Sequence, residues 1–308
     1  MTETYGGSAT PDRRRRPAAR VWAWVAGVVA VVVLGAAAWI GLQPRDEPAP
    51  AAATPSASPS PSPSPTPKPS PKPTPADYSL RSLPRPDIAE LLPRALPQAE
   101  AKSLEDLPGS VARPNDPRIP VWASPDVTEA PVLALESRYY DAEALWLVLD
   151  SRPGWVQVLI PYGRSALPSR DPEQVNGTAG WLRGSDVLLI REKRSVVVDL
   201  SDRTVTVTHA DGSSDRLPAA VGASATPTPQ GITQVFTVTE AVNTGMSVFL
   251  SMQSEALDGF YGTDYAATAI HVGVGQGQAV SNGCIRLTSA DFARLTDLDP
   301  GVPVLVKA

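Results

Sequence analysis

The feature that most constrains this chain is the stretch from Pro44 to Pro75, which consists almost entirely of Pro, Ser, Ala and Thr. Proline fixes φ and removes a backbone N–H donor, so this stretch favours polyproline II and cannot build a packed core. At about 3.1 Å per residue it would reach on the order of 100 Å when extended. We expect a spacer that separates whatever precedes it from the folded part of the chain.

An uncharged, mainly apolar run at residues 21–42 precedes the spacer. Its length suits a helix that crosses the hydrocarbon core of a bilayer. The basic flank, Arg13 to Arg16 with Arg20, predicts a cytoplasmic N-terminus and an extracytoplasmic remainder. The competing interpretation is a cleaved signal peptide, since small residues occur at 35–38, although the run is longer than a usual signal-peptide core. Tryptophans lie near both ends of the run, at Trp22, Trp24 and Trp39.

The charge distribution bears on partners. The whole chain has a formal net charge of −5, and residues 1–44 hold five Arg against Glu3 and Asp12, which leaves −8 for the remainder. An acidic extracytoplasmic part disfavours nucleic-acid binding, and the Arg cluster is better explained as a topology signal. A ligand role of the Pro-rich stretch for a proline-binding module is also disfavoured, because such modules are mainly cytosolic.

Two small β-rich units follow, together about 190 residues, which suffices for two cores. The first, at 118–190, has short segments rich in β-branched and aromatic residues, separated by turn formers such as Arg152-Pro153-Gly154. This pattern predicts a small barrel. We expect its tryptophans to pack in the core or at turns, the alternative being a ligand-binding groove. They are Trp122, Trp146, Trp155 and Trp181.

The second unit, at 192–308, reads as mostly β with one helix. Residues 194–200 and 204–208 predict a hairpin, and 216–221, 232–239, 247–250 and 302–306 continue the strand pattern. Thr288 with Asp291 resembles a capping box, which predicts a helix from Thr288 to Leu298. This unit holds both histidines and Cys284, the single cysteine of the chain.

Cys284 is the strongest candidate for chemistry. A free thiol is only a few per cent thiolate at neutral pH, so an imidazole that takes its proton creates the nucleophile and later returns a proton to a leaving amine. His271 is the expected base, oriented by a backbone carbonyl near Val272 or Gly273. The N–H groups of Gly283 and Cys284 are expected to stabilise an oxyanion. The residues thus predict cysteine-dependent acyl transfer.

Two resemblances sharpen this. The segments Gly154-Trp155-Val156-Gln157-Val158 and Gly180-Trp181-Leu182 look like the bacterial SH3-like family. The sequence Ala269-Ile270-His271 followed by Ser281-Asn282-Gly283-Cys284-Ile285-Arg286-Leu287 resembles the L,D-transpeptidase catalytic domain, and the similarity extends over nearly all of 192–308. The fold implied is a small SH3-like barrel followed by an L,D-transpeptidase-like β-sandwich with one short helix. The domain boundaries are then 1–20 cytoplasmic, 21–42 transmembrane, 43–117 linker, 118–190 SH3-like and 192–308 catalytic.

The second resemblance implies an enzyme that cross-links peptidoglycan at the plasma membrane. Cys284 would form a thioester with a stem peptide and release a D-amino acid, and an amine of a second stem would resolve it. Resolution by water would make the chain an L,D-carboxypeptidase, and loss of activity would leave a tethered wall-binding protein. Donor and acceptor stem peptides are the expected partners, β-lactams such as carbapenems the expected inhibitors, and no cofactor is expected.

Several residues near the thiol keep alternatives open. Arg286 would hold a substrate carboxylate or pair with a neighbouring acid, and Ser281 is expected to support the loop rather than act as a nucleophile. The family usually has His where this chain has Asn282. In the family, the upstream His is also separated from the Ser of the cysteine motif by more residues than His271 is from Ser281 here. Asn282, Ser281 and Arg286 are counted as substrate-binding candidates.

Other chemistries are disfavoured. The Gly-x-Gly-x-Gly run at 273–277 lacks the strand-to-helix setting and the Lys of a phosphate loop. One Cys and two separated His lack the spacing of a zinc site, so no metal is expected. His209, just before the Asp211-Gly212 turn, is expected to be a turn residue.

Overall fold

The computed structural model describes residues 74–139, 142–295 and 297–308. They belong to one compact unit that runs from Pro69 to Ala308. The predicted cytoplasmic segment, the predicted transmembrane helix and the Pro-rich stretch up to residue 73 lie outside the described residues. Among the helices that are described, none is long and apolar enough to cross a bilayer.

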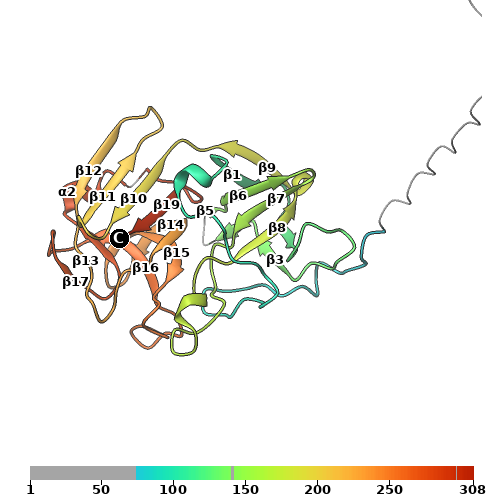
Figure 1. The fold of residues 1–308 in the computed structure, drawn as a ribbon, viewed down its shortest axis with the longest axis horizontal. Helices are drawn as coiled ribbons and strands as arrows, with labels where there is room; N and C mark the ends of the chain where they lie inside the picture. Colours follow the sequence, from blue (N-terminus) through green and yellow to red (C-terminus); the bar gives the residue numbers. More distant parts are fainter. Residues whose placement is uncertain (1–73, 140–141, 296) are drawn as a thin grey trace, which may run out of the picture. The chain divides into compact units, whose positions relative to one another are not determined.

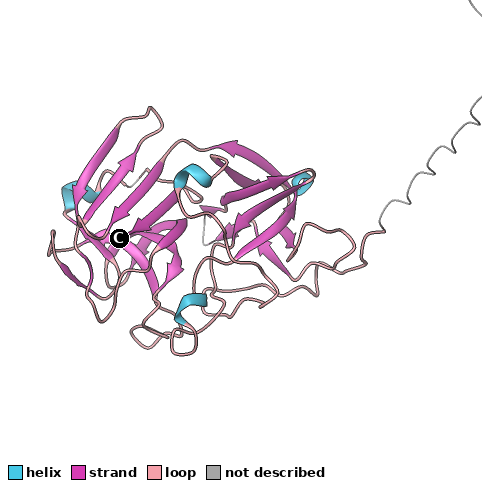
Figure 2. Ribbon diagram, viewed as in Figure 1, coloured by secondary structure: helices cyan, strands magenta, loops and turns pink. Residues whose placement is uncertain are grey.

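The described chain is mostly β, as predicted, with few and short helices (Figure 2). Three of these are single 3-10 turns: η1 (Leu104–Asp106), η2 (Pro172–Gln174) and η3 (Gly184–Asp186). The described residues contain one α-helix, α2 (Ser289–Phe292), near the C-terminus.

The N-terminal β region is built around a five-stranded sheet with the order β8-β7-β6-β1-β9 (Figure 1). All its neighbouring strands run antiparallel. Two small two-stranded sheets, β2 with β3 and β4 with β5, accompany it. The strands are β1 (Ser110–Pro114), β2 (Arg118–Val121), β3 (Leu133–Glu136), β4 (Arg138–Tyr139), β5 (Ala142–Glu143), β6 (Trp146–Arg152), β7 (Trp155–Leu159), β8 (Ala179–Arg183) and β9 (Val187–Arg191).

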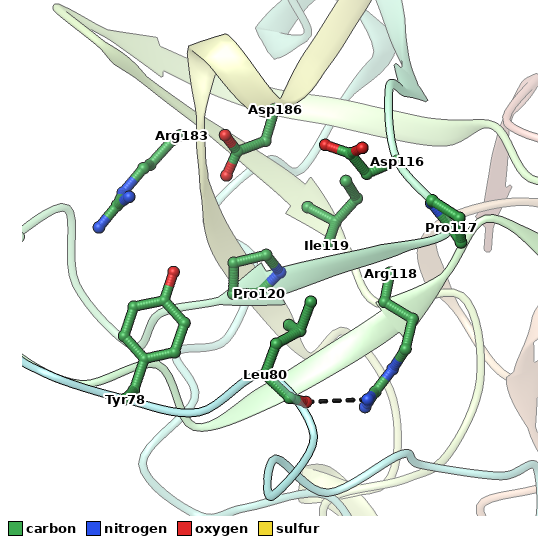
Figure 3. Close-up of a pocket in the computed structure, with 9 residues that line it drawn as sticks. All are labelled: Tyr78, Leu80, Asp116, Pro117, Arg118, Ile119, Pro120, Arg183 and Asp186. Atoms are coloured by element: carbon green, nitrogen blue, oxygen red, sulfur yellow. Dashed lines mark hydrogen bonds between the residues drawn. The ribbon is translucent and has the colours of Figure 1, made fainter.

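The folded region starts earlier than the sequence pattern indicated. Strand β1 lies within the range 43–117, where composition predicts linker, yet it pairs with both β6 and β9. Farther upstream, Leu92 and Leu96 are buried in the core of this region. The guanidinium of Arg118 also donates a 2.8 Å hydrogen bond to the Leu80 carbonyl (Figure 3). The late part of the predicted linker is therefore packed chain, because its few apolar and β-forming residues find partners far along the sequence.

The tryptophans of this region pack as expected. Trp122 and Trp146 are fully buried, and Trp181 is buried as well. Trp155 is partly exposed and stacks edge-on against Trp122, with ring centroids 5.3 Å apart. The core prediction is thus confirmed for the three buried rings.

The C-terminal β region holds an eight-stranded sheet with the order β12-β11-β10-β19-β14-β15-β16-β18. Two of its pairs, β10 with β19 and β16 with β18, are parallel, and the others are antiparallel. The strands are β10 (Ser195–Asp199), β11 (Thr204–Thr208), β12 (Ser214–Pro218), β13 (Val221–Gly222), β14 (Gly231–Ala241), β15 (Gly245–Gln253), β16 (Ala267–Val272), β17 (Ala279–Ser281), β18 (Ile285–Leu287) and β19 (Pro303–Lys307).

The sheet forms because its strands alternate in hydrophobicity. In β10 and β11 every second residue is a fully buried valine, and these side chains join one apolar cluster with residues of the other strands. The two ends of the sheet also meet. Ala220, two residues after β12, exchanges two backbone hydrogen bonds of 2.9 Å with Arg286 in β18. The eight strands therefore come close to a closed barrel.

The predicted helix from Thr288 to Leu298 is shorter in the structure. Thr288 caps α2 as expected, since its side chain accepts a hydrogen bond from the Asp291 N–H. Beyond Phe292 the chain continues in turns, with the Leu295 N–H bonded to the Phe292 carbonyl and the Leu298 N–H to the Leu295 carbonyl. Leu295 and Leu298 still reach the core, so their apolar spacing reflects burial rather than a continuing helix.

Candidate functional site

Strands β16 and β18 bring the two predicted catalytic side chains to one surface. Their parallel register pairs Ile270 with Ile285 and His271 with Arg286. Both isoleucines are fully buried in the core. Because successive side chains of a strand point to opposite faces, His271 and Arg286 share the other face, and Cys284, immediately before Ile285, joins them there. All three border one pocket of about 330 Å³.

His271 is held in the orientation that a general base requires. Its Nδ1 lies 2.9 Å from the carbonyl oxygen of Val272, the acceptor that the sequence suggested. A carbonyl only accepts, so Nδ1 carries the proton and Nε2 of the neutral ring is free to accept one. Burial lowers the pKa of His271 below its ordinary value, the bond to Val272 opposes this, and the charge of Arg286 lowers it further. The imidazole is therefore neutral at neutral pH.

Cys284 is partly buried, and its thiol is protonated at rest. Burial raises the pKa of the thiol, while the backbone N–H of Ala269 and the charge of Arg286 act to lower it. The sulfur lies 4.0 Å from the Ala267 carbonyl oxygen. Within the described residues, no hydrogen bond joins this sulfur to the His271 ring. The thiol and the imidazole thus share a pocket as a neutral pair.

The loop before Cys284 is organised by Ser281. The Ser281 hydroxyl donates to the Cys284 carbonyl at 2.5 Å and accepts from the Gly283 N–H at 3.2 Å. Its side chain is almost fully buried, which fits the predicted supporting role and not that of a nucleophile. The Gly283 N–H, one of the two expected oxyanion donors, therefore has an internal acceptor. Gly283 adopts φ 111°, a conformation that favours glycine.

The short Gly-rich loop between His271 and Cys284 is ordered by contacts with the opposite end of the sheet. The Gly277 N–H donates to the Ala219 carbonyl and the Val221 N–H to the Gln278 carbonyl. Strand β17 then pairs in parallel with β13. The interval from His271 to Ser281 returns the chain so that β18 lies directly beside β16.

Arg286 and Asn282 complete the predicted set. Arg286 lines the pocket, and within the described residues no carboxylate forms an ion pair with it. Its aliphatic part lies over Gly273, where a Cβ would come within 2.8 Å of Arg286 Cδ. Asn282 is exposed at the pocket rim. Arg286 thus borders a space that a ligand can occupy.

The pocket also includes residues that the sequence did not single out. Most come from the connection between β15 and β16, and the tandem aromatics Phe260 and Tyr261 stand out, with ring centroids 4.3 Å apart. The sequence signal that could have pointed to this loop is the pair of aromatic residues between Gly259 and Gly262 in an otherwise polar segment. The others from this connection and its flanks are Ser254, Leu257, Ala266, Ala267 and Thr268.

His209 and the N-terminal region lie apart from this chemistry. The His209 Nε2 is 3.1 Å from Asp215 Oδ2, and Asp215 also accepts from Arg294, so His209 belongs to a surface ion cluster. A second hollow of about 440 Å³ lies in the N-terminal region between Tyr78, Asp116, Arg183 and neighbouring residues (Figure 3). It contains neither thiol nor imidazole.

Comparison with known proteins identifies the C-terminal region. Residues 193–306 match the model of the YkuD family, described as the L,D-transpeptidase catalytic domain. This confirms the L,D-transpeptidase resemblance for the segment that holds His271 and Cys284. No curated protein matches the chain.

Solved L,D-transpeptidase structures are similar at low identity. One from Mycobacterium smegmatis is 20% identical, covers 50% of this chain and 91% of its own, and has a TM-score of 0.33. One from Mycobacterium tuberculosis H37Rv is 19% identical, with 50% and 90% covered and a TM-score of 0.34. L,D-transpeptidase 3 from Mycobacterium tuberculosis, in complex with a faropenem-derived adduct, is 16% identical, with 50% and 91% covered and a TM-score of 0.34.

Proposed function

We propose that this chain is an L,D-transpeptidase that cross-links peptidoglycan stem peptides by cysteine acyl transfer. The observation that carries the proposal is the pairing of β16 with β18, which sets Cys284 and an oriented His271 on one face of a pocket. The family match over 193–306 supplies the substrate class. The pocket supplies a nucleophile, a base and a free cation, which are the groups that this reaction needs.

In the acylation step, Nε2 of His271 takes the thiol proton as the Cys284 sulfur attacks the carbonyl carbon of the donor stem. The C–N bond to the terminal D-residue then breaks, and the imidazolium gives its proton to the departing amine. A thioester on Cys284 and a free D-amino acid result. Burial raises the pKa of the thiol and lowers that of the imidazole, which disfavours an ion pair formed before the attack and favours proton transfer during it.

The oxyanion of the tetrahedral intermediate needs backbone donors. The Cys284 N–H is the first candidate, because it has no acceptor among the described contacts, whereas the Gly283 N–H donates to Ser281 at 3.2 Å. The Gly283 N–H is the second candidate, and to serve it would exchange its bond with the Ser281 hydroxyl for one with the anionic oxygen. Removal of one such donor typically costs on the order of 3 kcal/mol in the transition state.

Arg286 is assigned to a carboxylate of the substrate. It lies on the catalytic face, borders the pocket and has no carboxylate partner within the described chain. A guanidinium in this setting suits the terminal carboxylate of the donor stem. Asn282 at the rim adds an amide for substrate hydrogen bonds, and Ser281 keeps the loop in place.

The reaction is tested with the purified full-length chain, a tetrapeptide stem and mass spectrometry. Wild type should release the terminal D-amino acid and form a cross-linked dimer, and Cys284→Ala should form neither. Release without dimer would show an L,D-carboxypeptidase, in which water resolves the thioester. Neither product from a folded, alkylatable protein would sink the enzyme proposal.

A catalytically impaired wall-binding protein is the second candidate. It is favoured by Asn282 and by the missing hydrogen bond between the thiol and the imidazole. The thiol itself also makes β-lactams the expected inhibitors, and one similar structure carries a faropenem-derived adduct. A carbapenem mass adduct on wild type, absent in Cys284→Ala, would argue against impairment. Retained wall binding without any adduct would favour it.

We also place the protein at the outer face of the plasma membrane, tethered by residues 21–42 and spaced from it by the Pro-rich stretch. The N-terminal β region is then an SH3-like domain beside the enzyme. Deletion of Thr54 to Pro75 should impair cell-wall function in cells and leave the purified enzyme fully active, because only the reach is shortened. Equal cellular complementation by the shortened and intact chains would refute the spacer.

A further inference from the structure

The connection between β15 and β16 forms one wall of the pocket, and its tip carries two aromatic rings. Phe260 and Tyr261 both border the pocket. The Tyr261 side chain is strongly exposed, and its backbone adopts φ 50°, which is rare outside glycine. This backbone conformation costs conformational free energy, so other contacts must stabilise it. Such strain is common at functional sites.

The tip, defined here as residues 259–263, is closed on itself. A Cβ on Gly259 would lie 2.0 Å from the Thr263 carbonyl oxygen, so the two sides of the tip touch backbone to backbone. The Thr263 hydroxyl lies within bonding distance of the carbonyls of Phe260 and Tyr265. The aromatic pair therefore moves with the base of the tip.

That base is held from the N-terminal β region by a single buried guanidinium. Nη2 of Arg164 donates to the Asp258 carbonyl at 2.8 Å and to the Asp264 carbonyl at 2.6 Å. These two carbonyls flank the tip on either side. Arg164 is 2% exposed, and its own backbone is fixed by hydrogen bonds with Glu90 and Leu92.

Neighbouring residues of the same loop reinforce this clamp. The Ser169 N–H and hydroxyl both donate to the Asp258 carboxylate, at 2.9 and 2.6 Å. The Asn176 amide exchanges two hydrogen bonds with the backbone of Gln253, where β15 ends. The start and the tip of the connection are thus both tied to the segment between β7 and β8.

The chemistry of Arg164 is unusual for a residue that serves stability alone. Its charge is buried without an ion-paired carboxylate, and its Nε and Nη1 have no hydrogen-bond partner among the described residues. The carboxylates of Asp258 and Asp264 favour this charge only from a distance, without a direct ion pair, so burying the cation is expensive compared with an apolar side chain of similar volume. What Arg164 contributes is a fixed geometry, because one of its nitrogens binds the carbonyls on both sides of the tip.

We propose that Arg164 is a positioning residue for the site, holding the tip so that Tyr261 contacts the donor stem beside Cys284. The inference rests on the proposed function for the identity of the substrate. It makes the N-terminal β region part of the substrate-binding machinery. The clamp itself is a property of the fold and is measurable without any substrate.

The first test compares Arg164→Met and Arg164→Lys with Arg94→Met, a control that removes an exposed arginine of the N-terminal β region. Hydrogen–deuterium exchange of peptides covering 254–266 should accelerate in Arg164→Met and stay near wild type in the control. Arg164→Lys should be intermediate, because one ammonium can still serve both carbonyls. Unchanged exchange in Arg164→Met would overturn the clamp whether or not the protein is an enzyme.

The second test separates positioning from general damage. With the tetrapeptide donor, Arg164→Met should raise KM about tenfold and change kcat little. Alkylation of Cys284 by iodoacetamide, which is too small to need the tip, should keep its wild-type rate. The double variant with Tyr261→Ala should bind the donor no worse than Tyr261→Ala alone, because both changes remove one contact.

The two tests distinguish failure of the clamp, failure of substrate binding by the tip and failure of the proposed function. Faster exchange with an unchanged KM would overturn the role of the tip in substrate binding. Turnover absent from wild type would refute the proposed function, and the exchange experiment would still decide the clamp. Where Arg164→Met fails to fold, Ser169→Ala, an exposed change that weakens the same anchor, should show faster exchange of the tip, and the proposal fails if it does not.

Discussion

At the scale of single residues, the site is a neutral pair rather than a preformed ion pair. Burial acts on both groups, raising the pKa of Cys284 and lowering that of His271. Arg286 lowers the pKa of each, because its charge favours the thiolate and disfavours the imidazolium. A thiol with a raised pKa holds less thiolate at neutral pH, so we expect Cys284 to react slowly with small alkylators.

The pH dependence of alkylation follows from these directions. The rate with iodoacetamide depends on the thiolate, so it should keep rising with pH beyond the ordinary thiol pKa of about 8.5. Arg286→Met should move the profile to still higher pH, since a charge that stabilises the thiolate is lost. Arg294→Met is the control, because Arg294 pairs with Asp215 on the surface. Second-order rates measured from pH 6 to 10 check this, and a plateau well below pH 8 would contradict it.

At the scale of elements, strands were predictable where one face is buried. Residues 204–208 alternate threonine with valine, residues 195–199 hold three valines in a row, and the structure places the expected hairpin there with Val197 opposite Thr206. Strand β1 was not predictable, because Ser110–Pro114 ends in proline and is stabilised by β6 and β9 rather than by its own pattern. The end of α2 was missed because turns after Phe292 bury the same leucines as a helix would.

The residues of the site also differ in how well the sequence predicts them, according to whether they depend on local motifs or on distant contacts. His271 and Cys284 could be singled out because each lies in a contiguous sequence motif, and the structure places both at one pocket. The contacts of Arg164 with Asp258 and Asp264 span 94 and 100 residues, and no local pattern marks an arginine that will be buried against carbonyls. The two aromatic rings at 260–261 are visible in the sequence, but their place beside the pocket is not, because the tip is anchored by a residue distant in the sequence.

Strand β13 offers a test at the element scale. A Cβ on Gly222 would lie 2.3 Å from the Thr228 nitrogen and 2.5 Å from the Thr226 oxygen, both backbone atoms. Gly222→Ala must therefore shift the 226–228 turn, whose Thr226 hydroxyl bonds the Ser281 carbonyl. We expect a loss of roughly 1–3 kcal/mol in the free energy of unfolding and slower acylation of Cys284.

Urea denaturation and the rate of carbapenem adduct formation measure these two effects. Gly184→Ala is the matched control, because its Cβ would meet atoms at an ordinary 3.5 Å. Wild-type stability and wild-type acylation in Gly222→Ala would show that the turn accommodates the methyl group without moving the cysteine loop.

At the scale of the whole described unit, the two β regions share interior contacts. Phe236 of β14 is buried in the apolar cluster of the N-terminal region, near the rings of Tyr139 and Tyr162. Next to it, Gln234 accepts a 2.5 Å hydrogen bond from the Leu147 N–H in β6. These contacts lie in the interior, so we expect the regions to unfold together.

Phe236→Ala tests this coupling, because all tryptophans of the described chain lie in the N-terminal region. The change is in the C-terminal region, yet it should lower the urea midpoint seen by tryptophan fluorescence, with a loss of about 3 kcal/mol. Fluorescence and far-UV circular dichroism should give one coincident transition. Met246→Ala, exposed on the adjacent strand, is the control. Separate transitions, or a fluorescence midpoint that does not move, would show that the regions are independent.

The near-closure of the eight-stranded sheet has a consequence for behaviour at high concentration. An open sheet edge is a template on which a strand of another chain can grow. Here β18 has only three residues, and both backbone groups of its central Arg286 are occupied by Ala220. The opposite edge, β12, carries Asp215, Arg216 and Pro218, which discourage pairing with a neighbour. Both edges of this sheet are therefore poorly suited to pairing with a strand of another copy.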